Sequence, residues 1–426
     1  MPSVITIFAC LILGLSFINP ILPPVIGIGE FTFRYIDVVT AFLLCIIFPK
    51  LPVWRFNFLR QGWWIIFKPL FPFVFYIGLS LGLVWIYAPS ALWASIASYI
   101  RLVTTILIGW LIYMSIEKEE DLQFIVKSIV FFAEISVIFG VWQTSFFSLK
   151  TLLTGRHGGF LGIGAFGFIS GLLIIWSAVV FIKGSFFPNW FVPLLSGLLG
   201  LFLSKSAAPI LATILSIMFL YIVFINPNSL KNKLKLTGIL TTGIIFSTII
   251  LLLLRTSDLM GLLGLKGGSW AQRLMIGYAA LQIFFTHPFG VGWQASKTKE
   301  IIGDPNLNKI LIQTFPEFPK HYFFLVEQTA IHNMYLQLLA ELGIVGFLLF
   351  IYSLIQIAKT IADILKKTQN SFQYNQIALF CVISLIYLLV WWNTKPLYGG
   401  HVESILAVSF LSIIARLYEL ESNNKR

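Results

Sequence analysis

The sequence predicts an all-α protein that crosses a membrane many times, and three observations support this fold class. Hydrophobic residues make up 58% of the 426 residues and charged residues only 11%, whereas soluble domains carry about 25% charged residues. The mean hydropathy of the chain is +0.90. Apolar runs long enough to cross a bilayer follow one another along most of the chain. We therefore expect a polytopic transmembrane helical bundle.

The apolar runs predict about twelve membrane spans, several of them interrupted by proline. The expected ranges are 4–28, 35–48, 69–87, 92–116, 122–142, 160–182, 189–203, 207–225, 236–254, 333–357, 375–393 and 401–416. The 13 Trp and 14 Tyr residues are typical of the aromatic belts at the two membrane surfaces. The lipid bilayer is therefore the first expected partner of this chain.

The distribution of Lys and Arg predicts the orientation of these spans. Fifteen basic residues fall in the short loops and tail on the side of the N-terminus, and five fall in the short loops on the other side. The positive-inside rule then places both termini in the cytoplasm. The chain divides into spans 1–9 (1–254), a large outer loop (255–331), and spans 10–12 with a cytoplasmic tail (332–426).

Composition also argues against several other kinds of site. The net charge of +12 is spread over many short loops, so membrane topology explains it better than a nucleic-acid partner. Cys10, Cys45 and Cys381 lie inside apolar runs, which favours packing over disulfide or metal ligation. The carboxylates of the outer loops are not paired, so we expect neither a bound metal nor another cofactor.

The large outer loop spans 77 residues from Arg255 to Ile331, and loops of that length without a function are uncommon. Ala271–Phe285 is predicted to be a helix that stops at His287-Pro288, because proline cannot continue it. Gly290-Val291-Gly292 is then expected to form a flexible turn. In this orientation, a cysteine introduced at Ser296 is expected to react from outside the cell.

The stretch from Ile331 to Phe347 begins with polar residues and continues as an apolar helix, the pattern of a chain entering a bilayer. Asn333 is the predicted N-cap. His332 lies at the positive end of the helix dipole, which favours a neutral imidazole able to accept a proton. Glu341 lies nine residues further, about 13 Å deeper, beyond hydrogen-bonding reach of His332. The alternative is that His332 is only a polar residue of the membrane surface.

Three basic side chains on the outer side are candidates for anion binding. Lys205 lies between two spans with almost no loop, a costly position for a charge unless it has a partner or snorkels to the surface. Arg273 opens the outer helix, at the end that disfavours a cation. Arg156 precedes His157-Gly158-Gly159, a turn that can present backbone N–H groups to an anion, although a solvated loop arginine explains it equally well. Arg and Lys suit a diphosphate, and a histidine suits deprotonation of a hydroxyl.

Four stretches of the chain resemble the bacterial O-antigen ligase and O-antigen polymerase superfamily of membrane glycosyltransferases. They are Thr154-Gly155-Arg156-His157-Gly158-Gly159-Phe160; Leu203-Ser204-Lys205-Ser206-Ala207-Ala208; Arg273 with His287-Pro288-Phe289-Gly290-Val291-Gly292; and His332-Asn333 through Glu341-Leu342-Gly343-Ile344-Val345-Gly346. Together they cover roughly Thr154–Phe350. The family's second motif usually reads Ser-Arg-Gly, so Lys205 replaces an arginine and offers a point charge instead of a bidentate fork.

The resemblance implies a GT-C-like enzyme of the bacterial inner membrane with its active site on the periplasmic side. It implies metal-independent, inverting transfer of a glycan from undecaprenyl diphosphate to an acceptor hydroxyl. Lys205 and Arg273 would then bind the diphosphate and stabilise the leaving group, with Arg156 as a looser candidate. His332 would activate the acceptor hydroxyl, and we do not expect His321 to be the base.

The resemblance leaves the acceptor open. An O-antigen ligase of lipopolysaccharide assembly uses the lipid A core, whereas an O-antigen or exopolysaccharide polymerase uses another carrier-linked glycan. We expect a ligase, with the polymerase as the alternative. A transporter of lipid-linked glycans is the rival class, since it also needs outer cations. Transporters bind near the bilayer midplane, however, where Arg101 is the main basic residue of this chain.

Overall fold

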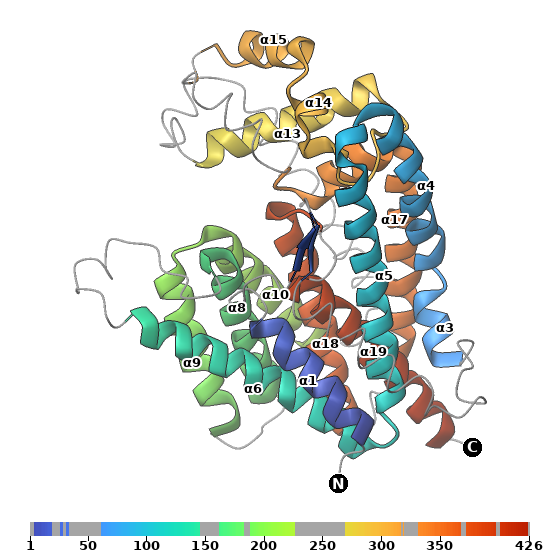
Figure 1. Cartoon of the computed structure of the whole chain (residues 1–426). Coiled ribbons are helices and arrows are strands. Elements are labelled where there is room, and N and C mark those ends of the chain that lie inside the picture. Colours follow the sequence, from blue (N-terminus) through green and yellow to red (C-terminus); the bar gives the residue numbers. More distant parts are fainter. Residues whose placement is uncertain are drawn as a thin grey trace.

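Helices account for almost all of the chain that the computed structural model describes, namely residues 4–18, 26–28, 31–33, 61–144, 162–182, 188–225, 269–316, 318, 331–367, 372–397 and 401–424 (Figure 1). The α-helices are α1 (Val4–Ile18), α3 (Gln61–Phe67), α4 (Leu70–Tyr87), α5 (Leu92–Ser115), α6 (Glu119–Thr144), α8 (Gly162–Ile182), α9 (Pro188–Ser204), α10 (Ala207–Ile225), α13 (Ser269–Thr286), α14 (Lys299–Ile302), α15 (Pro305–Thr314), α17 (Met334–Lys367), α18 (Phe372–Trp391) and α19 (Val402–Asn424). Short 3₁₀-helices are η3 (Pro89–Ala91), η5 (Ala295–Lys297) and η7 (Trp392–Thr394). Strands β1 (Ile26–Ile28) and β2 (Phe31–Phe33) form one antiparallel pair.

The described helices confirm the predicted fold class of a polytopic helical membrane protein. Six segments are long and apolar enough to cross a bilayer, and they comprise α4, η3 with α5, α6, α8, α17 and α18 with η7. Helices α1, α9 and α10 are apolar but shorter. All of these coincide with predicted spans, as does α19. The predicted spans at 35–48 and 236–254 lie outside the described residues.

The first predicted span is wrong in its second half. Helix α1 ends at Ile18, and Ile26–Ile28 forms strand β1 instead of continuing the helix. Pro20, Pro23 and Pro24 lie between the two elements. A proline inside a helix removes a backbone hydrogen bond and clashes with the preceding turn. The stretch is apolar enough for a span, but three prolines close together disfavour a continuous helix.

Helix α4 shows how the bundle satisfies both its core and its lipid-facing surface. Its buried side chains recur every three or four residues and are Phe73, Ile77, Ser80 and Val84. This spacing produces one stripe that faces the neighbouring helices. On the other side Trp85 is 67% exposed. Large apolar side chains are stable there because the bilayer, not water, surrounds the outer face.

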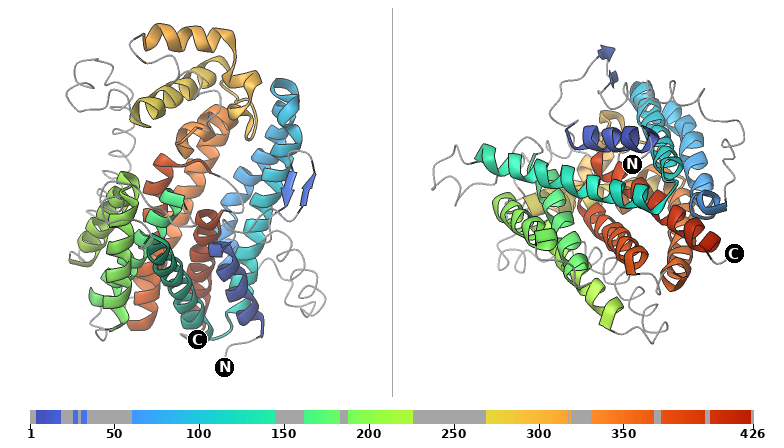
Figure 2. Two further views of the ribbon diagram at one scale, coloured as in Figure 1. Left: turned by 60° about the vertical axis from the view of Figure 1, so that its left-hand side comes forward. Right: turned by 90° about the horizontal axis from the view of Figure 1, so that it is seen from below.

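The helices of the predicted outer loop gather at one end of the bundle. Helices α13, α14 and α15 lie at this end, whereas the first turn of α1 and the last turns of α19 lie at the other end (Figures 1 and 2). At the latter end, Arg416 of α19 donates from Nε to the carbonyl of Ile116, 2.6 Å away, which ties α19 to the end of α5. Helix α13 also matches the predicted helix of the outer loop, and it stops directly before His287-Pro288 as expected.

Helix α17 is interrupted at Gly343, near the end where α13 lies. The backbone of Gly343 has φ +62° and ψ −165°, a conformation essentially restricted to glycine. The N–H of Ile344 donates to the carbonyl of Pro288 at 2.9 Å. In a regular helix this N–H would bond to Ala340, four residues earlier. The segment at Pro288, which is distant from α17 in the sequence, therefore replaces part of the helical hydrogen bonding at this turn.

The loop after α13 completes this replacement. The N–H groups of Val291 and Gly292 donate to the carbonyls of Ala340 and Glu341, at 3.2 and 2.8 Å. The N–H of Gly290 also donates to the carbonyl of His287 at 2.8 Å, so a turn is present as predicted, and it is packed against α17. Gly290 and Gly292 have positive φ angles, +90° and +99°, while Val291 between them is fully buried and both flanks are hydrogen-bonded. Glycine is needed here for close docking of two backbones. We call residues 288–298 the docked loop.

The docked loop and the break in α17 leave no room for side chains between them. A Cβ at Gly343 would lie 2.3 Å from the carbonyl carbon of Phe289 and 2.4 Å from the carbonyl oxygen of Pro288. A Cβ at Gly290 would lie 2.3 Å from the carbonyl oxygen of Glu341. Because these neighbours are backbone atoms, they cannot move aside without breaking the hydrogen bonds between the two segments.

We expect Gly343→Ala to destabilise the protein strongly. The backbone strain alone costs about 1–3 kcal/mol, and the contact with Phe289 and Pro288 adds to it. Thermal unfolding of the purified protein in detergent measures the loss as a lower Tm. Gly82→Ala in α4 is the matched control, because an added Cβ there meets no atom within 4 Å. Equal Tm values for the two variants would contradict this account of the break.

The end of the bundle that carries α13–α15 is expected on the outer side of the membrane. Ser296 is unsuitable as a probe of this, because it is only 1% exposed and its hydroxyl is hydrogen-bonded to Glu341 of α17. Lys299 is exposed at the same end, and Lys366 is exposed at the opposite end. We expect Lys299→Cys to react with a membrane-impermeant maleimide in intact spheroplasts, and Lys366→Cys to react only after lysis. The reverse pattern would invert the orientation.

Candidate functional site

The start of α17 is fixed by a side-chain cap next to His332. The Oδ1 atom of Asn333 accepts a hydrogen bond from the N–H of Leu336 at 3.1 Å, so the predicted N-cap is confirmed. His332 directly precedes this cap and is half-buried. Its neighbour Ile331 is almost fully buried among apolar side chains of α13 and the docked loop. The imidazole is therefore held on an ordered backbone at the end of the bundle that carries α13.

Two hydrogen bonds tie this start of α17 to the end of α18. The Nδ2 group of Asn333 donates to Oδ1 of Asn393 in η7 at 2.7 Å. Two residues further, the hydroxyl of Tyr335 donates to the carbonyl of Leu389 at 2.8 Å. Asn333 thus uses its oxygen to cap α17 and its nitrogen to bind η7. The position of His332 depends on both helices.

The connection to η7 brings in a cation that the sequence motifs missed. Lys395 follows Asn393 by two residues, and its Nζ lies 5.8 Å from the centre of the Trp391 ring. A Cβ at Gly164 in α8 would lie 3.0 Å from this Nζ. The Lys395 ammonium therefore lies against the first turn of α8, near Gly162, where that helix begins. In the sequence, Lys395 is noticeable only as one of five charges in outer loops.

Lys205 lies in the tight turn between α9 and α10, where it adopts a positive φ of 43° that is uncommon for residues other than glycine. Its side chain is half-buried. The turn packs on α8, because a Cβ at Gly167 would lie 3.0 Å from Oγ of Ser204 and 2.7 Å from Cγ of Pro209. Gly167 is three residues after Gly164, on the same face of α8. The same face of α8 therefore contacts the Lys205 turn and Lys395.

Arg273 lies in the second turn of α13 and is half-buried. It precedes the buried residues Ile276 and Ala280 by three and seven positions, so it continues the face of α13 that they define. These residues share an apolar cluster with Ile331 and with Ala340 of α17. The face of α13 that carries Arg273 is therefore the one that packs on the start of α17.

The remaining predicted residues divide into two groups. Arg156 and His321 lie outside the described residues. His287 is described, and its Nδ1 lies 2.9 Å from Oγ1 of Thr286 while its ring packs edge-on against Tyr87, with centroids 4.8 Å apart. His287 therefore joins the end of α13 to the end of α4, and nothing in these contacts connects it to His332.

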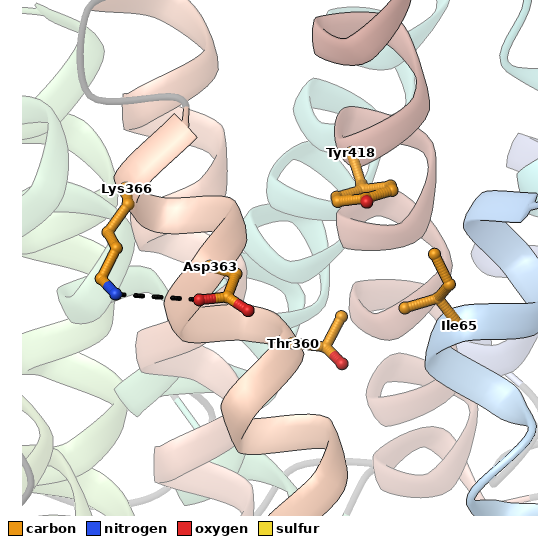
Figure 3. Close-up of a pocket in the computed structure, with 5 residues that line it drawn as sticks. All are labelled: Ile65, Thr360, Asp363, Lys366 and Tyr418. Carbon is orange, nitrogen blue, oxygen red and sulfur yellow. Dashed lines mark ion pairs between the residues drawn. The ribbon is translucent and has the colours of Figure 1, made fainter.

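Two cavities in the described part of the chain have none of the predicted site residues in their lining. One, of about 270 Å³, is lined by Ile65, Thr360, Asp363, Lys366 and Tyr418 (Figure 3). Its Lys366–Asp363 ion pair, 3.8 Å long, has side chains that are 53% and 67% exposed, so it contributes little free energy. It lies toward the C-terminal end of α17, far from His332. The second, of about 800 Å³, lies between α6, α8, α9 and α18.

Among the residues that the structure describes, no three His, Cys, Asp or Glu side chains are grouped so as to hold a metal ion. The candidate site is therefore defined by an imidazole and by lysine and arginine side chains. His332 lies at the start of α17, and Arg273 lies on the α13 face that packs there. Lys395 and the Lys205 turn both contact one face of α8. Such a set binds anions and transfers protons.

One comparison with known proteins gives a match. Residues 192–351 match a family model described as O-antigen ligase. The matched region contains Lys205, Arg273 and His332 and ends before Lys395. No curated protein sequence matches the chain. The family match, together with the many apolar helices, supports assignment of this multi-pass membrane protein to the O-antigen ligase and O-antigen polymerase superfamily.

Proposed function

We propose that the protein is an O-antigen ligase that transfers a glycan from undecaprenyl diphosphate to a hydroxyl of the lipid A core at the periplasmic face of the inner membrane. The observation that carries the proposal is the combination of the family match with the position of three matched residues. Lys205, Arg273 and His332 come from separate parts of the chain, and each lies on a helix end or face that borders the start of α17 or α8. A polymerase of the same superfamily is the alternative.

The cations are suited to bind the donor diphosphate. Lys395 lies beside the first turn of α8, where the helix dipole is also positive, so two positive features adjoin. A diphosphate placed there would be attracted by both, and Lys205 borders the same face of α8. Arg273 adds the bidentate fork that the lysines lack. Cations fixed before the reaction stabilise the negative charge that develops on the leaving diphosphate, and no metal ion is needed for this.

His332 is suited to act as the general base. In the proposed step, an acceptor hydroxyl oxygen attacks the anomeric carbon of the donor glycan from the face opposite the diphosphate. The bond between that carbon and the diphosphate oxygen breaks, its electrons leave with the undecaprenyl diphosphate, and the configuration inverts. The hydroxyl proton passes to the imidazole of His332. The cap at Asn333 and its bond to Asn393 fix the backbone from which the imidazole projects.

A deletion strain tests the choice of acceptor. If the protein is a ligase, polymerised O-antigen remains on its carrier and fails to appear on lipid A in an immunoblot of surface polysaccharide. If it is a polymerase, the lipid A core carries single repeat units. Unchanged surface polysaccharide in the deletion strain would contradict both forms of the proposal and favour another function, such as transport of lipid-linked glycans.

We expect His332→Gln to reduce turnover roughly 10²–10⁴-fold, the usual contribution of a general base, while binding of the donor is retained. Glutamine preserves the approximate size and a hydrogen-bonding group but is not basic enough to take up the proton. The measurement is glycan transfer by the purified variant in detergent, beside a separate measurement of carrier-lipid binding. His321→Gln is the control. Near-normal turnover of His332→Gln would mean that His332 is only a polar residue at the membrane surface.

We expect Arg273→Ala and Lys205→Ala to weaken stabilisation of the leaving group by about 2–4 kcal/mol each, and Lys205→Arg to retain or improve transfer. Lys395→Gln should also slow transfer, because it removes the charge beside the first turn of α8. Lys366→Gln, which removes an exposed lysine at the other end of the bundle, is the control.

All assays contain excess EDTA, because transfer is expected to need no metal ion. Wild-type rates in Lys205→Ala, or loss of wild-type transfer in EDTA, would each overturn part of this mechanism.

A further inference from the structure

Glu341 is a buried carboxylate to which the proposed reaction assigns no role. It lies in α17 two residues before the break and is 1% exposed. The hydroxyl of Ser296 donates to its Oε1 at 2.6 Å, and Nε2 of Gln337 donates to its Oε2 at 3.1 Å. The backbone of Gln294 also hydrogen-bonds to it, and the charge of Lys297 attracts it. Three donors and a cation therefore face this one side chain.

The hydrogen bonds continue beyond Glu341 to a third segment. Gln337 accepts a hydrogen bond on Oε1 from the N–H of Leu397 at 2.8 Å. The side-chain amide of Gln294 donates to the carbonyl of Leu397 at 3.3 Å. Leu397 follows Lys395 by two residues. The network thus joins the docked loop, α17 and the segment that carries Lys395.

The directions of these hydrogen bonds require an acceptor on both oxygens of residue 341. The N–H of Leu397 always donates, so Gln337 must present its oxygen to Leu397 and its NH₂ group to position 341. On the other side, Ser296 and the backbone of Gln294 also face position 341. An ionised carboxylate accepts on both sides, whereas the amide of a glutamine accepts only on one. An amide that turns its oxygen to Gln337 would present its NH₂ group to Ser296, whose hydroxyl can reverse and accept, and to the backbone N–H of Gln294, which can only donate. The N–H of Gln294 would then be a buried donor that faces another donor.

We propose that Glu341 is a positioning residue whose double-acceptor carboxylate locks the docked loop and the Lys395 segment onto α17. The docked loop directly follows α13, which carries Arg273, and α17 begins beside His332. The network would then set the position of the two donor-binding cations relative to the base. This consequence for catalysis rests on the proposed function, whereas the locking of the three segments does not.

The test exchanges one atom at a time. Glu341→Gln keeps the shape of the side chain but creates the donor–donor conflict. The double variant Glu341→Gln with Gln337→Glu moves the carboxylate one turn along α17. The double variant restores the number of acceptors and the net charge. The carboxylate now at position 337 accepts from the N–H of Leu397 and from the NH₂ group of the amide at position 341. The oxygen of that amide then accepts on the side of Ser296. Glu134→Gln, which neutralises a half-buried carboxyl in α6, is the matched control.

Hydrogen–deuterium exchange of the full-length protein in detergent reports on the lock without reference to activity. A buried donor left unpaired costs enough free energy to change a local opening equilibrium roughly tenfold. We therefore expect the amides of Val291, Gly292 and Trp293 to exchange at least roughly tenfold faster in Glu341→Gln. The double variant should return to the wild-type rate, and Glu134→Gln should not depart from it.

Glycan transfer reports on the positioning. A displacement of about 1 Å between reacting groups lowers rates by up to roughly 10²-fold, so we expect kcat of Glu341→Gln to fall roughly 10–100-fold. The KM for the donor should change by less than about threefold, because Arg273, Lys205 and Lys395 all remain. The double variant should recover most of the loss. If Glu341→Gln only destabilised the protein in general, the amount of active protein would fall, and adding Gln337→Glu would not restore it.

Two results would overturn the inference. The first is wild-type exchange of the docked loop in Glu341→Gln. The second is faster exchange that the double variant fails to restore, since a double acceptor would then not be what the site requires. Restored exchange with unchanged kcat in every variant would refute the positioning role. If the wild-type protein transfers no glycan, the proposed function fails, and the exchange rates still decide whether Glu341 locks the loop.

Discussion

The structure depends on the replacement of one turn of α17 by the backbone of the docked loop. At the break, the carbonyls of Ala340 and Glu341 accept from the N–H groups of Val291 and Gly292 and not from their own helix. The N–H of Ile344 likewise donates to the carbonyl of Pro288. In a membrane protein such an interruption is tolerated only where other protein groups satisfy the freed backbone. The loop supplies these groups, and Gly290, Gly292 and Gly343 permit the close approach. The docked loop follows the C-terminal end of α13, so its hydrogen bonds also join that end of α13 to α17.

Much of the fold was predictable because a bilayer imposes long apolar helices. The described helices α4, α5, α6, α8, α17 and α18 coincide with predicted spans, since hydropathy alone identifies a segment that must satisfy its own backbone. The first span failed because hydropathy ignores where prolines interrupt a helix, and α1 ends at Ile18. Helix α13 was predictable from its apolar pattern and from Pro288, which cannot continue it.

The sequence indicated which residues belong to the candidate site, but not which contacts hold them in place. His332, Arg273 and Lys205 were recognisable from charge, position and motif, and Asn333 as a cap from its place before an apolar helix. Lys395 was missed because its importance arises only from packing against Gly164 and from the bond between Asn333 and Asn393. Glu341 was noted for its distance from His332, but its partner Ser296 lies 45 residues away in sequence. The glycines suggested a turn, and their positive φ angles also permit the close, hydrogen-bonded contact with α17.

The central claim is that one donor diphosphate binds to Arg273 of α13 and to Lys205 and Lys395 beside α8, within reach of His332 at the start of α17. A cryo-EM structure of the full-length protein with bound undecaprenyl diphosphate tests it most directly. We predict density for the diphosphate in contact with Arg273, Lys205 and Lys395, with His332 on the far side of the position that the anomeric carbon of an attached glycan would occupy. Diphosphate density at the opposite end of the bundle, such as in the cavity between α6, α8, α9 and α18 that contains Lys127, would contradict the claim.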